Sequence, residues 1–313
     1  MNDIPSVPTT QPRITIALCT YNGAQHLSAQ LESYLAQTHT HWDLWVSDDG
    51  SSDDTLEILQ AFAAAQGRNR EIRIIQGPRK GFALNFLSLL GHPDFPAQPV
   101  ALSDQDDVWL PEKLALALAE TAADTPVLYG AQSIHTDEAL TPIGQSLGGG
   151  DPSFGNALVQ NIVSGHSMVL NTAALSLVRA AGLPQDIPYH DWWLYQLISG
   201  ADGKVIVRPD TVLLYRQHGL NAMGSHQGIR ALTTRTAQVF GKTYGQWIAA
   251  NTASLRAVAP LLSPDAQAAL TLLETHTKSI GLARPRAFAQ ASIARQGQLG
   301  TFLLYLAVLT GRV

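Results

Sequence analysis

The sequence predicts an α/β fold in which a mainly parallel sheet carries helices on both faces. The chain has 313 residues, a length that allows one large domain or two. Hydrophobic residues make up 45% and charged residues 14%, and the mean hydropathy is +0.02. These values exclude a disordered polyelectrolyte and indicate a large buried core. Up to residue 121, strand patterns alternate with helix patterns, which is typical of parallel sheets.

Four strand–helix pairs make up this alternation. The segment 13–19 is rich in β-branched residues and predicts a strand, and leucines at helical spacing follow in 24–36. The next pairs are 43–47 with 53–65, 71–75 with 82–90, and 99–103 with 111–121. Ser52 or Asp53 would cap the second helix, and Pro111 opens the fourth. Because such crossovers are right-handed, we expect the four strands to end at one edge of the sheet, where ligands bind.

Beyond residue 121 the pattern is less regular. We expect strands at 127–132, 167–170, 204–208 and 212–216, a short helix at 191–199 and a flexible loop at 148–152. After about residue 220 the pattern is helical and predicts no strand. The sequence therefore divides into a disordered segment at 1–12, an α/β domain at 13–224 and a helical region at 225–313.

Cysteine content and the first residues indicate a reducing compartment. The one cysteine, Cys19, excludes a disulfide framework and a cysteine zinc cluster, and we expect it to be a small buried apolar residue. No cationic stretch followed by an apolar run opens the sequence, so it predicts no signal peptide. We therefore expect a cytoplasmic protein.

The net charge of −5 conceals an asymmetry. Residues 1–210 hold 10 Lys and Arg against 23 Asp and Glu, a net charge of −13, whereas residues 211–313 hold 10 against 2, a net charge of +8. An acidic front does not suit nucleic acid, so we expect no nucleic-acid partner. The basic tail would face phosphates or an anionic membrane.

Two acid clusters directly follow predicted strands. Asp48 and Asp49 come after the second strand, and Asp104 and Asp106 come after the fourth. Clustered carboxylates repel one another, so they need a cation or exposure to solvent. Acids two residues apart on a tight loop can converge on one ion, and oxygen ligands suit Mg²⁺ or Mn²⁺. The alternative interpretation, a solvated loop that caps a helix, fits Asp53 and Asp54 better than it fits Asp104 and Asp106.

Two nucleotide-binding patterns are absent from the sequence. No G-x-G-x-x-G follows the first strand, which argues against a nicotinamide enzyme, and no Walker pattern occurs, which argues against a P-loop NTPase. Instead, four blocks occur in order: T-Y-N-G at 20–23, D-D-G-S-S-D-D-T at 48–55, D-Q-D at 104–106 and H-D-W-W at 190–193. The segments 80–86 and 165–171 form two lesser blocks.

This ordered set resembles the family 2 glycosyltransferases, which have the GT-A nucleotide-sugar fold. The D-Q-D-D-V-W and H-D-W-W forms are most similar to rhamnosyltransferase-like members that build bacterial surface polysaccharides. The resemblance implies a GT-A catalytic domain at 13–224, with a donor half at about 13–110 and an acceptor half at about 111–224. It also implies inverting transfer from a dTDP- or UDP-linked sugar, with Mn²⁺ or Mg²⁺, to a glycan or a polyprenyl-diphosphate-linked acceptor.

The resemblance assigns roles to individual residues. Asp191 would be the general base, and Asp106 would ligate the metal with Asp104 beside it. His218 would complete the metal shell, or it would be a structural or acceptor-contacting histidine. Trp192 would stack on a sugar or pack in the core, and Arg79 would either add positive charge near the nucleotide or lie in a solvated turn. The donor nucleotide would be contacted by Thr20, Tyr21, Asn22, Asp48, Asp49, Lys80, Asn85 and Asp104.

Other activities stay open at this point. The Q-x-x-R-W block of processive synthases is absent, so transfer of a single sugar is favoured over polymerisation. A sugar-1-phosphate nucleotidyltransferase uses a similar sheet, but it would need a glycine-rich basic loop at 20–23, which this sequence lacks. A catalytically inactive nucleotide-sugar-binding protein is the other alternative, although both Asp106 and Asp191 are present.

The basic tail ends in an apolar segment. Residues 299–309 carry no charge, and this segment is too short to span a bilayer, which needs about 20 residues. It would pack as a core or dimer helix, or it would lie peripherally on the inner membrane with the neighbouring cations facing anionic lipid. The oligomeric state stays open.

Overall fold

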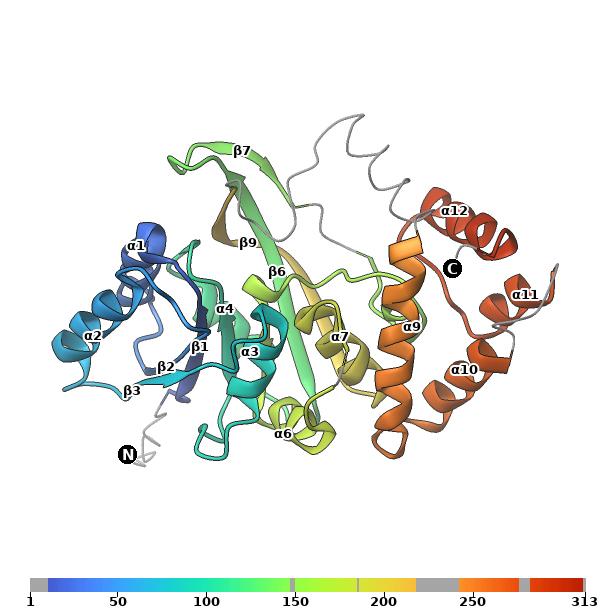
Figure 1. The fold of residues 1–313 in the computed structure, drawn as a ribbon, viewed down its shortest axis with the longest axis horizontal. Helices are drawn as coiled ribbons and strands as arrows, with labels where there is room; N and C mark the ends of the chain where they lie inside the picture. The colour runs from blue at the N-terminus through green and yellow to red at the C-terminus, as the bar shows by residue number, and fades with distance from the viewer. Residues whose placement is uncertain (1–10, 147–149, 185, 218–241, 276–281, 312–313) are drawn as a thin grey trace, which may run out of the picture.

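The computed structural model describes residues 11–146, 150–184, 186–217, 242–275 and 282–311. Within these residues one sheet organises the molecule, with strand order β3-β2-β1-β4-β8-β6-β9-β5 and β7 paired to β6 (Figure 1). The neighbours β3, β2, β1 and β4 are parallel, and β8 runs antiparallel to β4 and β6. The strands are β1 (Ile14–Thr20), β2 (Trp42–Asp48), β3 (Ile72–Gln76), β4 (Val100–Ser103), β5 (Val108–Trp109), β6 (Val127–Thr136), β7 (Pro142–Gln145), β8 (Val169–Leu170) and β9 (Lys204–Arg216).

Helices cover both faces of the sheet, as the alternating pattern predicted. Those of the α/β part are α1 (Ala24–Leu35), α2 (Thr55–Gln66), α3 (Phe82–Leu90), α4 (Lys113–Glu120), α5 (Phe154–Ala157), α6 (Thr172–Ala181) and α7 (His190–Gly200), with a 3₁₀ turn η1 (Gly165–Ser167). The C-terminal region consists of α9 (Lys242–Ala257), a 3₁₀ turn η2 (Ala259–Leu261), α10 (Pro264–Thr275), α11 (Ala283–Gln290) and α12 (Gln298–Leu309).

The central strands β1 and β2 are buried along their whole length because each face of the sheet meets a different core. Ile16 and Leu18 of β1 pack in one hydrophobic cluster with Leu27 and Leu31 of α1. Ala17 of β1 belongs to the other cluster, which also includes residues of α3, α6 and α7. Alternate side chains of a strand point to opposite faces, so a continuous apolar run such as 13–19 is what a doubly covered parallel strand requires.

The structure differs from the sequence prediction at β9. The segments 204–208 and 212–216 are one strand, Lys204–Arg216, parallel to β6. The pairing shifts register between Gly130 and Gln132, opposite the segment that contains Pro209. Proline has no N–H to donate to a ladder, so an irregular stretch absorbs it without ending the strand.

The segment 167–170 also forms less strand than predicted. Its start belongs to the 3₁₀ turn η1, and only Val169 and Leu170 pair with neighbouring strands. Four elements, β5, β7, α5 and α6, were not predicted. Of these, α6 is capped at its N-terminus by Asn171, whose side chain accepts a hydrogen bond from the backbone N–H of Ala174.

The described C-terminal helices pack on the α/β part and share its core. Leu255 of α9, Leu270 of α10, Phe288 of α11 and Leu304 of α12 belong to the same hydrophobic cluster as the α7 side chains. Figure 1 shows α9 beside α7, with α10 to α12 beyond it. The predicted segment 1–12 and the predicted boundary at 224 fall mostly or wholly outside the described residues. Among the described helices, none combines the length and hydropathy needed to cross a bilayer.

Asn171 should be a strong stabiliser of this arrangement. Its Oδ1 accepts from the N–H groups of Val127 and Ala174, and its Nδ2 donates to the carbonyls of Ala123 and Thr125. We expect Asn171→Ala to lower the free energy of unfolding by about 2–4 kcal/mol, since two buried and two partly buried hydrogen bonds each contribute in the lower part of the range of about 0.5–1.5 kcal/mol. Urea unfolding measures the loss. The exposed Ser176→Ala on the same helix is the control, with an expected change within about 0.5 kcal/mol, and equal losses in the two variants would contradict the assignment.

Candidate active site

The loops that follow β1, β2 and β4 meet at the carboxyl edge of the sheet and hold one another by hydrogen bonds. Asn22 connects the first two loops, because its N–H donates to Ser51 Oγ at 2.8 Å and its Oδ1 accepts from the Ser52 N–H at 2.8 Å. Asp53 accepts from the N–H of Ala24 and from Thr55 Oγ1, so it joins the starts of α1 and α2. The D-D-G-S-S-D-D-T block therefore fixes the loop after β1.

The loop after β4 joins this network through Gln105. Its Oε1 accepts from the Tyr21 N–H at 2.8 Å, and its Nε2 donates to the Tyr21 carbonyl at 3.0 Å. This amide lies against Gly23, where an added Cβ would be 2.2 Å from Gln105 Oε1. A larger residue at this position would displace the Gln105 amide. The side chain of Tyr21 is itself exposed at this edge.

Asp48 and Asp49 use their carboxylates within the chain. Asp48 accepts from Thr20 Oγ1, from Ser51 Oγ and from the N–H groups of Gly50 and Ser51. Asp49 accepts from the N–H groups of Arg79 and Gly81, at 2.6 and 2.8 Å. Both side chains are buried and hold these loops in shape. A contact with a nucleotide would be a second role for them.

The segment after β3 completes the rim of the site. Lys80 is exposed, and the side chain of Arg79 lies against Gly50 of the neighbouring loop. Asn85 on α3 is buried, with its Oδ1 accepting from Ser47 Oγ at 2.6 Å and its Nδ2 donating to the Ser47 carbonyl at 2.9 Å. Asn85 therefore ties α3 to β2, directly behind the Asp48–Asp49 loop.

The residues 104–107, which we name the acid loop, carry three carboxylates. Asp104 and Asp106 are partly exposed, whereas Asp107 is completely buried. Arg216 at the end of β9 anchors the loop, because its N–H donates to Asp107 Oδ1 and its Nε donates to the Asp106 carbonyl at 3.0 Å. Burial and the charges of Asp106 and Asp191 raise the pKa of Asp104 to about 7. Burial and the charges of Asp106 and Asp104 raise the pKa of Asp107 above its usual range.

Lys113 is the cation that opposes this negative charge. It is completely buried at the start of α4, with Nζ 3.5 Å from the centre of the Trp109 ring and donating to the His166 carbonyl. Burial lowers the pKa of Lys113 below its usual range, while the charges of Asp107 and Asp104 act to keep it protonated. In turn, Lys113 lowers the pKa of both carboxyls. Lysine is almost never completely buried unless opposite charges lie close to it, and here the acid loop provides them.

The structure brings Asp104, Asp107 and His166 together as a group that could hold a metal ion. One potential ligand atom from each lies within 4.8 Å of the others. The Oδ2 of Asp107 has no hydrogen-bond partner among the described residues, so it is available to bind a cation. Burial, Lys113 and His135 lower the pKa of His166 to about 3, so its ring is neutral at physiological pH. Two carboxylates and a neutral imidazole are a donor set that a divalent cation accepts.

Asp191 lies in the first turn of α7 and faces the acid loop. Its Oδ2 accepts from the Gly165 N–H at 3.1 Å and its Oδ1 from the Trp192 N–H at 2.7 Å. Burial raises the pKa of Asp191 to about 6, although these hydrogen bonds act to lower it. The charge of Asp191 also contributes to the raised pKa of Asp104, so the two carboxyls interact across the site. A carboxylate with a pKa near neutrality is suited to accept a proton.

The neighbours of Asp191 belong to the core. Trp192 is 4% exposed, and its Nε1 donates to the Ala157 carbonyl while its ring stacks on Tyr244. The alternative in which Trp192 packs in the core therefore describes this structure, and its ring offers no open face to a sugar. His190 stacks on Phe86 with ring centres 4.1 Å apart, and burial lowers its pKa to about 3.

The structure thus gathers most of the predicted site residues at one edge of the sheet. Thr20, Asn22, Asp48, Asp49 and Asn85 shape its floor and walls, and the acid loop faces Asp191 across it. His218 lies outside the described residues. Asp107, Lys113 and His166 were not assigned roles from the sequence. Asp107 directly adjoins the D-Q-D motif and Lys113 follows shortly after it, whereas His166 comes from a distant segment and is brought close only by folding.

Removing the Lys113 charge should destabilise the protein in a pH-dependent way. Lys113→Met removes a positive charge that lowers the pKa of Asp104 and Asp107, so their folded-state pKa values rise further above the unfolded value. Above the Asp104 pKa of about 7 the carboxylates must ionise without this charge, and we expect a loss of about 3–5 kcal/mol there. The loss should shrink as the pH falls and the carboxyls are protonated in both states. Thermal unfolding across this pH range tests it, with the exposed Lys204→Met as control, and a pH-independent loss would contradict the charge pairing.

Comparisons with known proteins agree with this geometry. A family model described as Glycosyl transferase family 2 matches residues 15–175, just over half of the chain, and covers the loops after β1, β2 and β4. The dTDP-rhamnosyl transferase RfbG of Shigella flexneri is 27% identical over 239 residues, which are 72% of this chain and 80% of that protein. WfgD of Escherichia coli, a UDP-Glc:alpha-D-GlcNAc-diphosphoundecaprenol beta-1,3-glucosyltransferase, is 29% identical over 131 residues, which are 41% of this chain and 48% of that protein.

Two solved structures show the same fold. The mannosyltransferase PcManGT from Pyrobaculum calidifontis, solved in complex with GDP-Man and Mn²⁺, matches 97% of this chain and 87% of that one, with a TM-score of 0.53 and 18% identity. Residues 1–349 of S. aureus TarS, solved with UDP-GlcNAc, match 89% of each chain, with a TM-score of 0.51 and 15% identity. Fold, ordered motifs and family model together show that the chain is a glycosyltransferase of the GT-A fold and belongs to glycosyl transferase family 2.

Proposed function

We propose that this glycosyltransferase moves a single L-rhamnose from dTDP-rhamnose to a glycan or polyprenyl-diphosphate-linked acceptor in bacterial surface polysaccharide synthesis. The Shigella relative, which spans most of the chain, supports the donor. The Escherichia relative supports a lipid-linked acceptor. The observation that carries the proposal is Asp191, a carboxyl with a pKa near neutrality that faces the acid loop at the sheet edge.

Asp191 acts as the general base in this proposal. Its carboxylate removes the proton of the acceptor hydroxyl while the hydroxyl oxygen attacks the anomeric carbon of the donor. The bond between that carbon and the diphosphate oxygen breaks, and the sugar is transferred with inversion. Hydrogen bonds from Gly165 and Trp192 hold the carboxylate in place for this step.

The acid loop is the proposed metal site. A bound Mn²⁺ or Mg²⁺ would neutralise the leaving diphosphate. Asp104 and Asp106 are the ligands we favour for it, because a metal that contacts a donor has to be reached from solvent and both carboxylates are partly exposed. Asp107 is completely buried and His166 nearly so, and we propose that they, with Lys113 and Arg216, hold the loop in shape. The group Asp104, Asp107 and His166 is the second candidate, because the unpartnered Asp107 Oδ2 favours it.

The location proposed is the cytoplasm. The lone Cys19 is buried, and burial together with the charges of Asp104 and Asp49 raises its thiol pKa well above the usual value. A single thiol kept in this state is compatible with a reducing compartment.

Replacement of Asp191 tests the base. We expect Asp191→Asn to lower the rate of transfer about 10²–10⁴-fold with donor affinity unchanged, because the amide keeps the shape but does not accept the proton. The release of dTDP from dTDP-rhamnose in the presence of acceptor measures the rate, and calorimetry measures donor affinity. The exposed Asp124→Asn should behave like the wild type. A near-normal rate for Asp191→Asn would place the base elsewhere.

The pH profile gives a second readout of the same base. The carboxyl of Asp191 works only when deprotonated, so kcat/KM of the wild type should rise with pH around a midpoint of about 6. A profile without an ascending limb in that region would argue against Asp191.

Two variants separate the candidate metal sites. Asp106→Asn should weaken the Mn²⁺-dependent binding of dTDP-rhamnose about tenfold or more, since loss of a ligand or its supporting partner typically costs about 10–100-fold in metal affinity. His166→Gln should leave that dependence close to the wild type. Calorimetric titration of the donor with and without Mn²⁺ measures both. The opposite pattern would favour the group Asp104, Asp107 and His166.

A further inference from the structure

The two long faces of α12 have opposite environments. Leu304, Ala307 and Val308 are buried in the main hydrophobic cluster, so this face packs on the protein. The other face carries four large apolar side chains at spacings of three and four residues, which align them in one stripe. Their exposed fractions are 61% for Leu299, 64% for Phe302, 40% for Leu306 and 45% for Leu309.

This stripe is unusual for the described part of the chain. Elsewhere the exposed large apolar residues lie singly on different elements, such as Leu56 on α2 and Ile143 on β7. Single exposed apolar residues are ordinary on protein surfaces, whereas a contiguous stripe marks an interaction site. Figure 1 places α12 at the end of the molecule opposite to α2.

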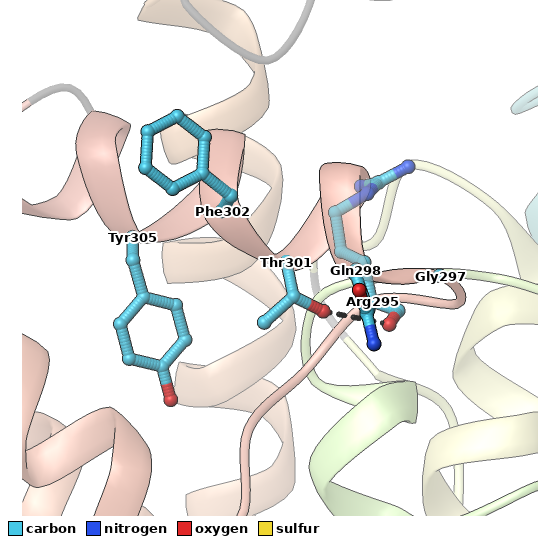
Figure 2. A pocket seen from close by; sticks show the side chains of 6 residues that line it. All are labelled: Arg295, Gly297, Gln298, Thr301, Phe302 and Tyr305. Atoms are coloured by element: carbon cyan, nitrogen blue, oxygen red, sulfur yellow. Dashed lines mark hydrogen bonds between the residues drawn. The ribbon is translucent and has the colours of Figure 1, made fainter.

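A shallow hollow of about 610 Å³ lies beside the stripe and contains a fixed cation. It is lined by Arg295, Gly297, Gln298, Thr301, Phe302 and Tyr305 (Figure 2). The Nη1 of Arg295 donates to the Val159 carbonyl at 3.0 Å and to Tyr244 Oη at 2.8 Å, so the guanidinium is held in place. Because Arg295 is also partly exposed, its charge lies beside the apolar stripe.

The surrounding chain carries the same sign of charge. After Glu274 the sequence contains five Lys and Arg residues and no acid. Of these, Arg286 is exposed and Arg284 is partly exposed, and both lie on α11, which packs against α12. Exposed apolar side chains with cations nearby are the combination that anionic lipid attracts, with about 1 kcal/mol from each cation near the surface.

We propose that α12, with Arg286 and Arg295, docks the protein on a membrane surface that carries anionic lipid headgroups. The stripe enters the boundary between headgroups and acyl chains, and the two arginines contact the headgroups. A second copy of the chain fits this face less well, because a symmetric interface would bring the same cations of both copies together. The proposal does not depend on the sugar or the acceptor, and its test needs neither.

Vesicle co-sedimentation of the full chain at low salt tests the proposal. We expect the wild type to pellet with vesicles of phosphatidylcholine and phosphatidylglycerol, to stay in solution with phosphatidylcholine alone, and to dissociate as salt screens the charges. The double variant Phe302→Ser and Leu306→Ser should lower the partition coefficient at least about tenfold, since it removes two apolar anchors. Arg286→Gln should lower it about fivefold.

Leu56→Ser is the matched control, because it removes an exposed leucine at the far end of the molecule, and it should bind vesicles like the wild type. Thermal unfolding of the double variant should equal that of the wild type, since the replaced side chains are exposed. Three outcomes would overturn the proposal: no binding to anionic vesicles, equal binding by the double variant, or a concentration-dependent dimer in light scattering that the double variant abolishes.

Discussion

The crowding of like charges in the acid loop is the constraint on which the candidate site depends. Asp104, Asp106 and Asp107 repel one another, and the charge of the buried Lys113 opposes this repulsion. Lys113 in turn needs the Trp109 ring and the His166 carbonyl, so its position requires β5, α4 and η1 to meet. The partial neutralisation leaves room for a further cation at the exposed side of the acid loop, which is where a metal that serves the donor would bind.

The rigidity of the site comes from side chains that a motif search would assign to ligand binding. Asp48, Asp53 and Asn85 form hydrogen bonds with neighbouring loops and strands. This does not compete with a role in donor binding, because a nucleotide site has to be preorganised by a supporting shell. It does mean that substitutions in the D-D-G-S-S-D-D-T block should affect folding and any donor binding together.

The last helix has two faces with different environments. One face of α12 completes the hydrophobic core beside Phe288, and the opposite face presents an apolar stripe beside Arg295. A helix can carry both faces because its side chains repeat every 3.6 residues and so sort into separate faces. The polarity of the molecule, with an acidic sheet edge and a cationic apolar end, follows the division of charge along the chain.

The sequence by itself determined the sheet, its edge and the chemistry available there. Apolar runs such as 13–19, which alternate with segments of helical spacing, are local signals that predict the strands and helices. The acids that directly follow the strands can be placed at one edge of the sheet, because parallel strands end at the same edge. Only the tertiary structure decided how those groups work. It joined 204–216 into one strand across Pro209, buried Trp192 instead of offering it to a sugar, buried Lys113 against the acid loop, and brought His166 there from a distant segment. The physical reason is that pairing between distant side chains depends on burial and on long-range contacts, which no window of sequence contains.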